Sequence, residues 1–444
     1  MSESSTTRVS VDVASMAHAA RKASRKLAIL SNETRKSALL AIADALEADH
    51  QRILSANAQD CVLAERLVSS GKMTQALFSR LRIKEDGIAE MAARVREVAN
   101  LPDPLGKQLA ATEMDQGLTL YKESCPLGVI AVVFESRPDV VPQVAALALK
   151  SGNAVLLKGG AEAANSNETI VELWRESLCR FSEVPQESIQ LLQSRSDVLE
   201  LLKLQGEVDL LIPRGSKEFV AFMGQNSRIP VLGHGEGICH VYIDRAADLD
   251  KAVAITLDSK VQYPAACNSV ETLLVHQDVA AKFLPRIVAE LQGANVEVRG
   301  CPRVLALLPK EKLIATTERD WSTEYSDLIL SVKIVDSLDD GLEHIHRYGS
   351  KHTECIVTED QAAAERFLQE IDAAGVFHNA STRFADGYRY GLGAEVGISN
   401  GKLHARGPMG IEGLTTYKYM LRGSGQTVVE YSSGARTFKH KPLP

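Results

Sequence analysis

Hydrophobic and polar positions alternate along the chain with two different periods. Residues 11–100 carry apolar side chains at helical spacing with charges between them, which predicts a helical segment. From Gly128 onward, helix-like stretches such as VVPQVAALALKS separate short apolar runs, namely GVIAVVFES, AVLLKGG, SIQLLQ and DLLIP. Strands that alternate with helices in this way predict parallel βαβ units, which bind ligands at the carboxyl ends of their strands.

A second series of the same kind begins near Asp248 and ends with the predicted strand GVFHN. We therefore expect an α/β fold with two open parallel, Rossmann-like domains that meet in a cleft, and we divide the chain into 1–246, 247–380 and 381–444. The last segment is rich in Gly and Arg and ends in two strand-like stretches, TTYKYMLRG and GQTVVEYSS. We interpret these stretches as a small β arm that extends a sheet within or between subunits.

Composition narrows the class of protein. The chain has 444 residues, of which 45% are hydrophobic and 24% charged, and its formal net charge of −7 offers no basic field for nucleic acid. No apolar run reaches the length of a membrane span. We interpret the start, MSESSTTRVSVD, as a short polar tail before a helix rather than as a targeting segment.

The cysteines and histidines give no pattern of a metal site or a disulfide framework. The seven cysteines stand at positions 61, 125, 179, 239, 267, 301 and 355. They are scattered, odd in number and never spaced C-x-x-C, which favours a reducing cytoplasm. His346 and His352 come close to one predicted strand, but the acids and cysteines needed to complete a metal site do not cluster with them. We expect no metal.

Cys267 is the candidate nucleophile. In VQYPAACNSVETLLV it follows two small residues, Ala265 and Ala266, and stands just before a predicted strand. The backbone N–H groups of Cys267 and Asn268, or the Asn268 side chain, are placed to donate to an oxyanion beside the sulfur. The alternative is that Cys267 is a small, inert buried residue, as most cysteines are.

The first series of strands contains candidates for cofactor binding, although G-x-G-x-x-G is absent. In LLIPRGSKEF, Gly215 and Ser216 separate a strand from a helix whose N–H groups would hold a pyrophosphate, whereas the simpler interpretation is an N-cap serine. The strand AVLLKGG ends in Lys158 and Gly159, where an NAD-preferring site would carry an acid.

A cation at that position favours the 2′-phosphate of NADPH. Arg195 and Ser196, in LLQSRSD at the end of the next strand, are candidates for the same pocket. A solvated surface lysine is the alternative interpretation of Lys158.

Candidates for binding an anionic substrate lie in two regions. Ser136 and Arg137, in FESRPD, follow the first strand, and Arg137 has the geometry to hold a carboxylate or phosphate with two hydrogen bonds. Arg383, His404 and Arg406 come from the glycine-rich stretches NASTRFADG and KLHARGPMG. For Arg137, a structural salt bridge would give the same sequence pattern.

Five stretches together resemble one branch of the aldehyde dehydrogenase superfamily, the gamma-glutamyl phosphate reductases of the proline pathway. They are VIAVVFESRPDVVPQVAALALKSGNAVLLKGGAEAANSN, DLLIPRGSKEFV, YPAACNSVETLLVH, HRYGSKHTECIVTED and NASTRFADGYRYGLGAEVGISNGKLHARGPMGIEGLTTYKY. The resemblance implies NADPH-dependent reduction of L-glutamate 5-phosphate to the 5-semialdehyde, with release of phosphate and with Cys267 as the acyl-accepting thiolate. It also implies an NADPH-binding domain over 1–246, a catalytic domain over 247–380 and, over 381–444, a return to the cofactor domain followed by a C-terminal β oligomerisation arm.

One departure from the oxidising aldehyde dehydrogenases fits a reductive direction. Leu232 in PVLGHGEGICHVYID stands where the resemblance places their water-activating Glu, and Glu236 is out of register. Two alternatives stay open: a CoA-acylating or other dehydrogenase of the same fold, and a non-catalytic partner of glutamate kinase. We expect a homo-oligomer with a small-molecule substrate, a transient association with that kinase, and no nucleic-acid or membrane partner.

Overall fold

The computed structural model describes residues 12–233 and 235–444, so the predicted polar tail lies outside the described residues. The chain forms two compact units. The first contains the described residues up to Leu232 together with Leu392–Gly397 and Met409–Pro444, and the second contains Gly233–Gly391 and Ile398–Pro408. The predicted boundary at 246 lies later than this changeover, because the strand Cys239–Ile243 pairs within the second sheet.

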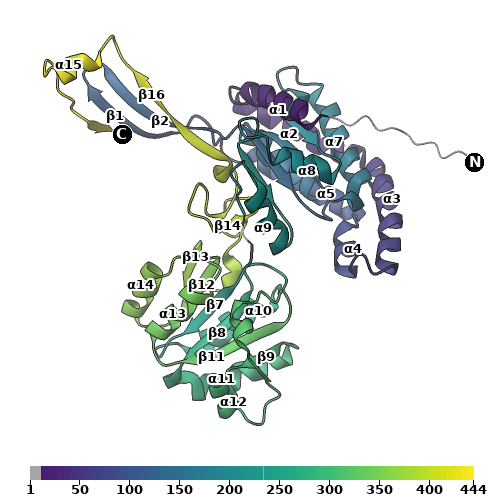
Figure 1. Cartoon of the computed structure of the whole chain (residues 1–444), viewed down its shortest axis with the longest axis vertical. Helices are drawn as coiled ribbons and strands as arrows, with labels where there is room; N and C mark the ends of the chain where they lie inside the picture. Colours follow the sequence, from purple (N-terminus) through teal and green to yellow (C-terminus); the bar gives the residue numbers. More distant parts are fainter. Residues whose placement is uncertain (1–11, 234) are drawn as a thin grey trace, which may run out of the picture. The chain divides into compact units, whose positions relative to one another are not determined.

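Helices form the N-terminal part of the first unit, which confirms the helical period of residues 11–100. Side chains of Asp12, Ser31 and Thr74 each accept a hydrogen bond from a backbone N–H of the helix that they precede. The helices are α1 (Val13–Leu27), α2 (Asn32–Ala48), α3 (His50–Ser69), α4 (Gln75–Leu81) and α5 (Glu85–Asn100). They are labelled in Figure 1.

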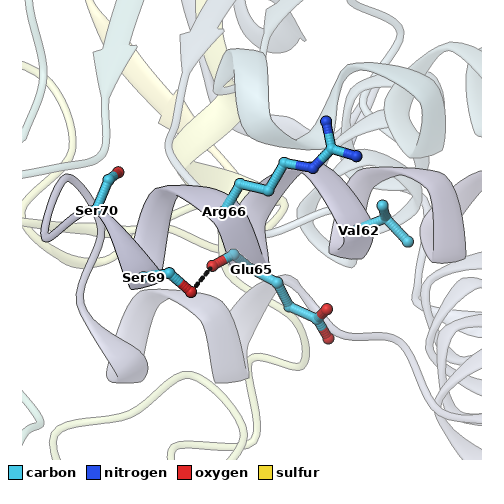
Figure 2. Close-up of a pocket in the computed structure, with 5 residues that line it drawn as sticks. All are labelled: Val62, Glu65, Arg66, Ser69 and Ser70. Atoms are coloured by element: carbon cyan, nitrogen blue, oxygen red, sulfur yellow. Dashed lines mark hydrogen bonds between the residues drawn. The ribbon is translucent and has the colours of Figure 1, made fainter.

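The outer face of α3 carries a shallow recess (Figure 2). Val62, Glu65, Arg66, Ser69 and Ser70 line it, and all five belong to this helix or its C-cap. The hydrogen bond marked in Figure 2 runs from Ser69 Oγ to the Glu65 carbonyl at 2.9 Å, so both partners belong to α3 itself. None of the residues predicted to bind a ligand lies in this recess.

The first sheet is parallel, with strand order β5-β4-β3-β6. Its central strand β3 is buried along its whole length, as expected for a strand covered on both faces. The strands are β3 (Val129–Val133), β4 (Ala154–Lys158), β5 (Ile189–Leu191) and β6 (Leu210–Pro213). The helices between and after them are α6 (Val140–Lys150), α7 (Ala164–Leu178), α8 (Arg195–Leu201) and α9 (Lys217–Asn226), which confirms the predicted alternation.

The second sheet has seven parallel strands in the order β10-β9-β11-β8-β7-β12-β13. Its strands are β7 (Cys239–Ile243), β8 (Val270–His276), β9 (Glu297–Gly300), β10 (Ile314–Ala315), β11 (Ile329–Val335), β12 (Thr353–Val357) and β13 (Gly375–His378). The helices are α10 (Leu249–Val261), α11 (Gln277–Gly293), α12 (Pro302–Leu307), α13 (Leu338–Tyr348) and α14 (Gln361–Glu370). The short strands β14 (Ile398–Ser399) and β15 (Gly407–Pro408) pair with each other in the same unit.

Two apolar clusters cover the two faces of this sheet. Val241 belongs to the cluster with α11, whereas its neighbour Tyr242 belongs to the cluster with Leu342 of α13 and Phe367 of α14. Successive side chains of a strand point to opposite faces, so this assignment shows helices on both sides. The expected α/β architecture with parallel sheets is therefore confirmed.

A four-stranded antiparallel sheet corresponds to the predicted β arm. Its order is β16-β2-β1-β17, with β1 (Gln108–Asp115), β2 (Leu118–Pro126), β16 (Thr415–Arg422) and β17 (Lys441–Leu443), and Figure 1 shows β1, β2 and β16 side by side. The prediction of a second terminal strand in GQTVVEYSS was wrong. Val428–Ser432 forms the short helix α15, because Thr427 and Glu430 form a capping box that satisfies its first N–H groups.

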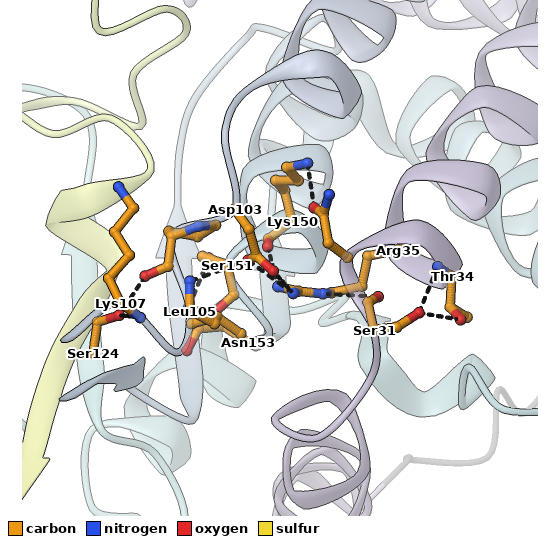
Figure 3. A network of polar contacts seen from close by, with 12 residues as sticks. Ser31, Thr34, Arg35, Asp103, Leu105, Lys107, Ser124, Lys150, Ser151 and Asn153 are labelled. Atoms are coloured by element: carbon orange, nitrogen blue, oxygen red, sulfur yellow. Dashed lines mark hydrogen bonds and ion pairs between the residues drawn. The ribbon is translucent and has the colours of Figure 1, made fainter.

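A buried polar network joins the helices to the start of this arm (Figure 3). The Arg35 guanidinium, only 1% exposed, donates to both oxygens of Asp103 at 2.9 Å and to the Lys150 carbonyl at 2.6 Å. Lys150 Nζ in turn donates to Asn32 Oδ1 and to the Ala99 carbonyl. The network ties α2, α5 and α6 to the loop that leads into β1. Burial lowers the pKa of Lys150, and the neighbouring charge of Arg35 lowers it further.

Replacing Arg35 by Met is expected to lower the free energy of unfolding by about 3 kcal/mol. The Lys150 carbonyl and the Asp103 carboxylate both lose their charged hydrogen-bond donor in this variant. Arg96→Met is the matched control. Arg96 also joins α5 to α2 through carboxylates, but it is about one-third exposed, so its loss should cost less than about 1 kcal/mol. Urea unfolding followed by circular dichroism measures both, and equal midpoint shifts would contradict the assigned role of Arg35.

Candidate active site

Cys267 lies in a tight turn between α10 and β8. The turn is closed by hydrogen bonds from the Ala266 N–H to the Tyr263 carbonyl at 3.2 Å and from the Ser269 N–H to the Ala266 carbonyl at 2.9 Å. The thiol-bearing residue is half-buried. Because β8 begins at Val270, Cys267 stands at the amino end of a central strand, opposite the carboxyl edge at which sheets of this type usually bind ligands.

The Gly237 backbone lies directly against the backbone of Cys267. A Cβ built on Gly237 would stand 2.0 Å from the Cys267 carbonyl oxygen, so only glycine fits at this approach. Two residues later, Cys239 Sγ donates to the same carbonyl at 3.4 Å. Gly237 itself donates its N–H to Glu324 at 2.9 Å, and this hydrogen bond holds the Gly237 backbone against Cys267.

Asn268 is buried at 3% exposure and ties the turn to the loop after β13. Its side-chain amide donates to the Ala385 carbonyl at 2.9 Å and to the Arg383 carbonyl at 3.5 Å. This side chain was predicted as an oxyanion donor, but its amide N–H groups are engaged in hydrogen bonds to the loop. The backbone of the turn is left as the more suitable source of donors beside the sulfur.

Among the predicted substrate residues of the second unit, Arg383 lies beside the Cys267 turn. It is buried at 7% exposure, donates from Nε to Gln262 Oε1 at 2.9 Å, and its guanidinium lies 5.8 Å from the centre of the Tyr263 ring. Burial lowers the pKa of Arg383 first, and the neighbouring Arg389 lowers it further, whereas Cys267 acts in the opposite direction. Arg383 is thus a buried cation that contacts the residues leading into the Cys267 turn.

Arg406 and His404 belong to the loop between β14 and β15. Arg406 is engaged by Asp372, whose carboxylate lies 2.9 Å from the guanidinium and 2.8 Å from Lys402 Nζ. Lys402 and then Arg406 hold the pKa of Asp372 near 2, despite partial desolvation. His404 has a left-handed backbone with φ of 66°. Arg406, predicted as an anion-binding residue, is thus held in a salt bridge with Asp372.

The carboxyl edge of the first sheet gathers the predicted cofactor residues Lys158 and Gly159 with Ser136. Ser136 has a φ of 40°, a strained value for a residue with a side chain, and donates from its N–H and its Oγ to Glu162 Oε1 at 2.7 and 2.6 Å. Its neighbour Arg137 bonds Asp139 at 2.8 Å. The acid Glu162 was missed by sequence reasoning, although it follows Lys158 by only four positions.

Electrostatics at this edge are mixed. Burial lowers the pKa of Lys158, while Glu162, Asp197 and Glu135 raise it in that order. Burial and then the charge of Glu162 raise the pKa of Glu135. One partly buried ammonium therefore stands among three carboxylates at the place where a nucleotide ribose would bind in a doubly wound sheet.

The remaining cofactor candidates lie at two helix starts. Arg195 and Ser196 open α8, where Ser194 and Asp197 form a capping box and the Ser194 and Ser196 hydroxyls lie 2.7 Å apart. Ser216 caps α9 by accepting from the Phe219 N–H at 3.3 Å, and it is exposed together with Gly215. The simple interpretation of Ser216 as an N-cap is therefore correct, and it leaves the position open to a ligand.

Leu232 is buried in the first unit, where its N–H donates to the Leu211 carbonyl at 2.9 Å. Glu236 belongs to the second unit, and its carbonyl accepts from Asn400 at 3.4 Å. Within residues 12–233 and 235–444, no three metal-ligating side chains cluster, and no helix is both long and apolar enough to cross a membrane.

Comparison with known proteins gives the fold and the family. Residues 4–300 match the aldehyde dehydrogenase family. The chain is 55% identical over 423 residues to the gamma-glutamyl phosphate reductase of Synechococcus sp. (strain JA-3-3Ab), covering 95% of this chain and 92% of that protein.

Solved structures agree with this relationship. The crystal structure of gamma-glutamyl phosphate reductase from Thermotoga maritima has a TM-score of 0.90 at 40% identity and covers 94% of this chain and 100% of that one. An acetylating aldehyde dehydrogenase from Geobacillus thermoglucosidasius shares the fold alone, with a TM-score of 0.63 at 17% identity over 94% of this chain and 97% of that one. The expected aldehyde dehydrogenase-like fold is therefore confirmed, and the chain belongs to the aldehyde dehydrogenase family, within it to the gamma-glutamyl phosphate reductases.

Proposed function

We propose that the chain reduces L-glutamate 5-phosphate to L-glutamate 5-semialdehyde with NADPH, as the second step of proline synthesis from glutamate. The observation that carries the proposal is the Cys267 turn, in which a half-buried thiol follows Gln262 and Tyr263, the two residues that the buried cation Arg383 contacts. The high identity to proteins named gamma-glutamyl phosphate reductase supports the choice of substrate.

Cys267 acts as the nucleophile. Its thiolate attacks the acyl carbon of the substrate, a C–S bond forms, and the bond from carbon to the phosphate oxygen breaks to leave a thioester and inorganic phosphate. Phosphate is a good leaving group, so acylation needs no strong general acid. The Arg383 cation favours both the thiolate and an anionic substrate beside it.

The edge of the first sheet fits a nicotinamide dinucleotide. The capped start of α9 with the open Gly215–Ser216 step suits a pyrophosphate, and Lys158 suits a 2′-phosphate, while Glu162 is the type of group that binds ribose hydroxyls. A bound reduced nicotinamide supplies the hydride that reduces the thioester. The oxyanion of the resulting hemithioacetal re-forms its C=O bond as the C–S bond breaks, so the aldehyde leaves and Cys267 returns to the thiolate.

Water must be kept from the thioester for this direction to succeed. Leu232 is buried and apolar, and by resemblance it occupies the position of the water-activating Glu of oxidising relatives. The thioester therefore lacks that base and survives to meet hydride. Association with the kinase that makes the labile acyl phosphate remains a prediction.

Cys267→Ala is expected to lower kcat at least about a thousandfold, because no other group can carry the acyl chain. The assay runs in reverse: glutamate 5-semialdehyde, NADP⁺ and phosphate, with NADPH followed at 340 nm. Cys179→Ala, which alters an exposed cysteine, is the control and should be unaffected.

The same assay separates the alternatives. Reduction of NADP⁺ that ignores phosphate but requires CoA would replace the proposed substrate by a CoA thioester. No reduction by folded protein would favour the non-catalytic partner of a kinase.

Lys158→Ala is expected to lower kcat/KM for NADPH about tenfold or more while leaving the value for NADH within about twofold, because only NADPH carries the 2′-phosphate. Lys203→Ala, which removes an exposed lysine of the same unit, should change neither value. Equal losses with both cofactors would show that Lys158 serves the nucleotide in another way.

The β arm supplies a surface for a second copy of the chain, and we propose a homo-oligomer on that basis. Strand β16 is an edge strand, and alternate positions along it expose Tyr417, Tyr419 and Leu421 at 47%, 61% and 58%. An unpaired edge with an apolar face is a template for pairing with another chain.

Replacing Tyr419 and Leu421 together by Lys is expected to shift the protein to a smaller assembly in light scattering, because charges oppose pairing along that face. Ile29→Lys, at a position 86% exposed outside the arm, serves as the control. An unchanged mass for the arm variant would place the subunit contact elsewhere.

A further inference from the structure

Lys260 and Glu271 form a buried ion pair at the base of the Cys267 turn. Lys260 lies in the last turn of α10 and Glu271 is the second residue of β8. Their side chains are 0% and 1% exposed, and Lys260 Nζ lies 2.7 Å from Glu271 Oε2. The mechanism above uses neither residue.

The pair closes the loop that carries Cys267. The two residues are 11 positions apart, and next to them Ser269 Oγ donates to the carbonyl of Ser259, the residue before Lys260, at 3.2 Å. Cys267 stands within this loop, so the direction of its backbone depends on how the two ends of the loop are held together.

The same ion pair is linked to the Gly237 backbone that lies against Cys267. The second oxygen of Glu271 accepts from the Ser326 N–H at 3.2 Å, and Ser326 holds a left-handed backbone with φ of 52°. Two residues earlier, Glu324 accepts from the Gly237 N–H, and Gly237 lies against the Cys267 backbone. The segment 324–326 therefore binds both Glu271 at the base of the loop and the Gly237 backbone that touches the loop.

Stability is a poor explanation for this pair. Burial raises the pKa of Glu271 to about 7 and lowers the pKa of Lys260, so desolvation opposes both charges. Buried ion pairs are often no more stabilising than apolar side chains of similar size, whereas their directional contacts specify one geometry.

We propose that Lys260 and Glu271 are positioning residues, which hold the loop so that the Cys267 thiol faces Arg383 and the incoming acyl carbon. The proposal rests on the function of Cys267 proposed above. Reactive geometry tolerates little displacement, because an error of about 1 Å can cost about a hundredfold in rate.

The test replaces the pair by apolar residues of similar size, Lys260→Met with Glu271→Met. Ser326 is exposed, so water can accept the hydrogen bond that its N–H loses. The matched control is Lys251→Met with Glu359→Met, which removes a solvent-exposed ion pair of 2.9 Å from the same helix α10.

Two readouts are taken, the rate at which iodoacetamide alkylates Cys267, followed by peptide mass spectrometry, and kcat and KM in the reverse assay. The buried-pair variant is expected to keep its melting temperature within a few degrees of the unaltered protein. Alkylation of Cys267 and kcat should each fall about tenfold or more, with KM nearly unchanged, while the control variant changes neither.

Unchanged alkylation of Cys267 in the folded double variant would overturn the proposal. Should that variant fail to fold, Glu271→Asp retains the charge but shortens the reach, and it too should slow alkylation; an unchanged rate there would also overturn the proposal. Alkylation needs no substrate, so a chain that reduces no acyl phosphate would refute the proposed function while the effect of the pair on the thiol is still measured.

Discussion

The close approach of Gly237 to Cys267 is the contact on which the arrangement of the second unit depends. A side chain at 237 would collide with the carbonyl of Cys267, so the chain entering β7 can lie beside the thiol only as bare backbone. Three further interactions fix this approach: the carboxylate of Glu324 on the Gly237 N–H, the Cys239 thiol on the Cys267 carbonyl, and the adjacency of β7 and β8 in the sheet. The turn therefore has a rigid support on one side, and its position follows from the order of the strands.

The second sheet also explains why the thiol stands where it does. Parallel strands place their carboxyl ends at one edge, and most ligands of such folds bind there. In this unit the turn before β8 uses the other edge, where Asn268 and Arg383 join it from the loop after β13. The first sheet follows the general rule, since Lys158, Ser136 and Glu162 gather at its carboxyl edge. The two units thus present their polar groups from opposite ends of their strands.

Sequence patterns predicted the elements better than the contacts between them. The alternation of strands and helices, the helical N-terminal part and Cys267 before a strand could be read from local period and composition. Arg383 was predicted only as an anion-binding candidate in a glycine-rich stretch, and its position beside the turn was not predicted, because tertiary contacts leave no periodic signal. Lys260 in an amphipathic helix is indistinguishable from a solvated lysine until its partner Glu271 is seen. In the terminal stretch, β-branched residues predicted a strand, but the capping box at Thr427 decided for a helix.

The path of the chain between the two units bears on how the protein is made. The second unit has all its residues once Pro408 has been synthesised, whereas the first is completed only by Met409–Pro444, whose last strand pairs with β1. Domains fold as they emerge from the ribosome, at about 5–20 residues per second. The sheet that carries Cys267 can therefore be finished first, while strands β1 and β2, made several hundred residues earlier, wait with open edges for their partners. Translation order therefore has the arm close after the second unit is complete, and its open strands need protection from premature pairing until then.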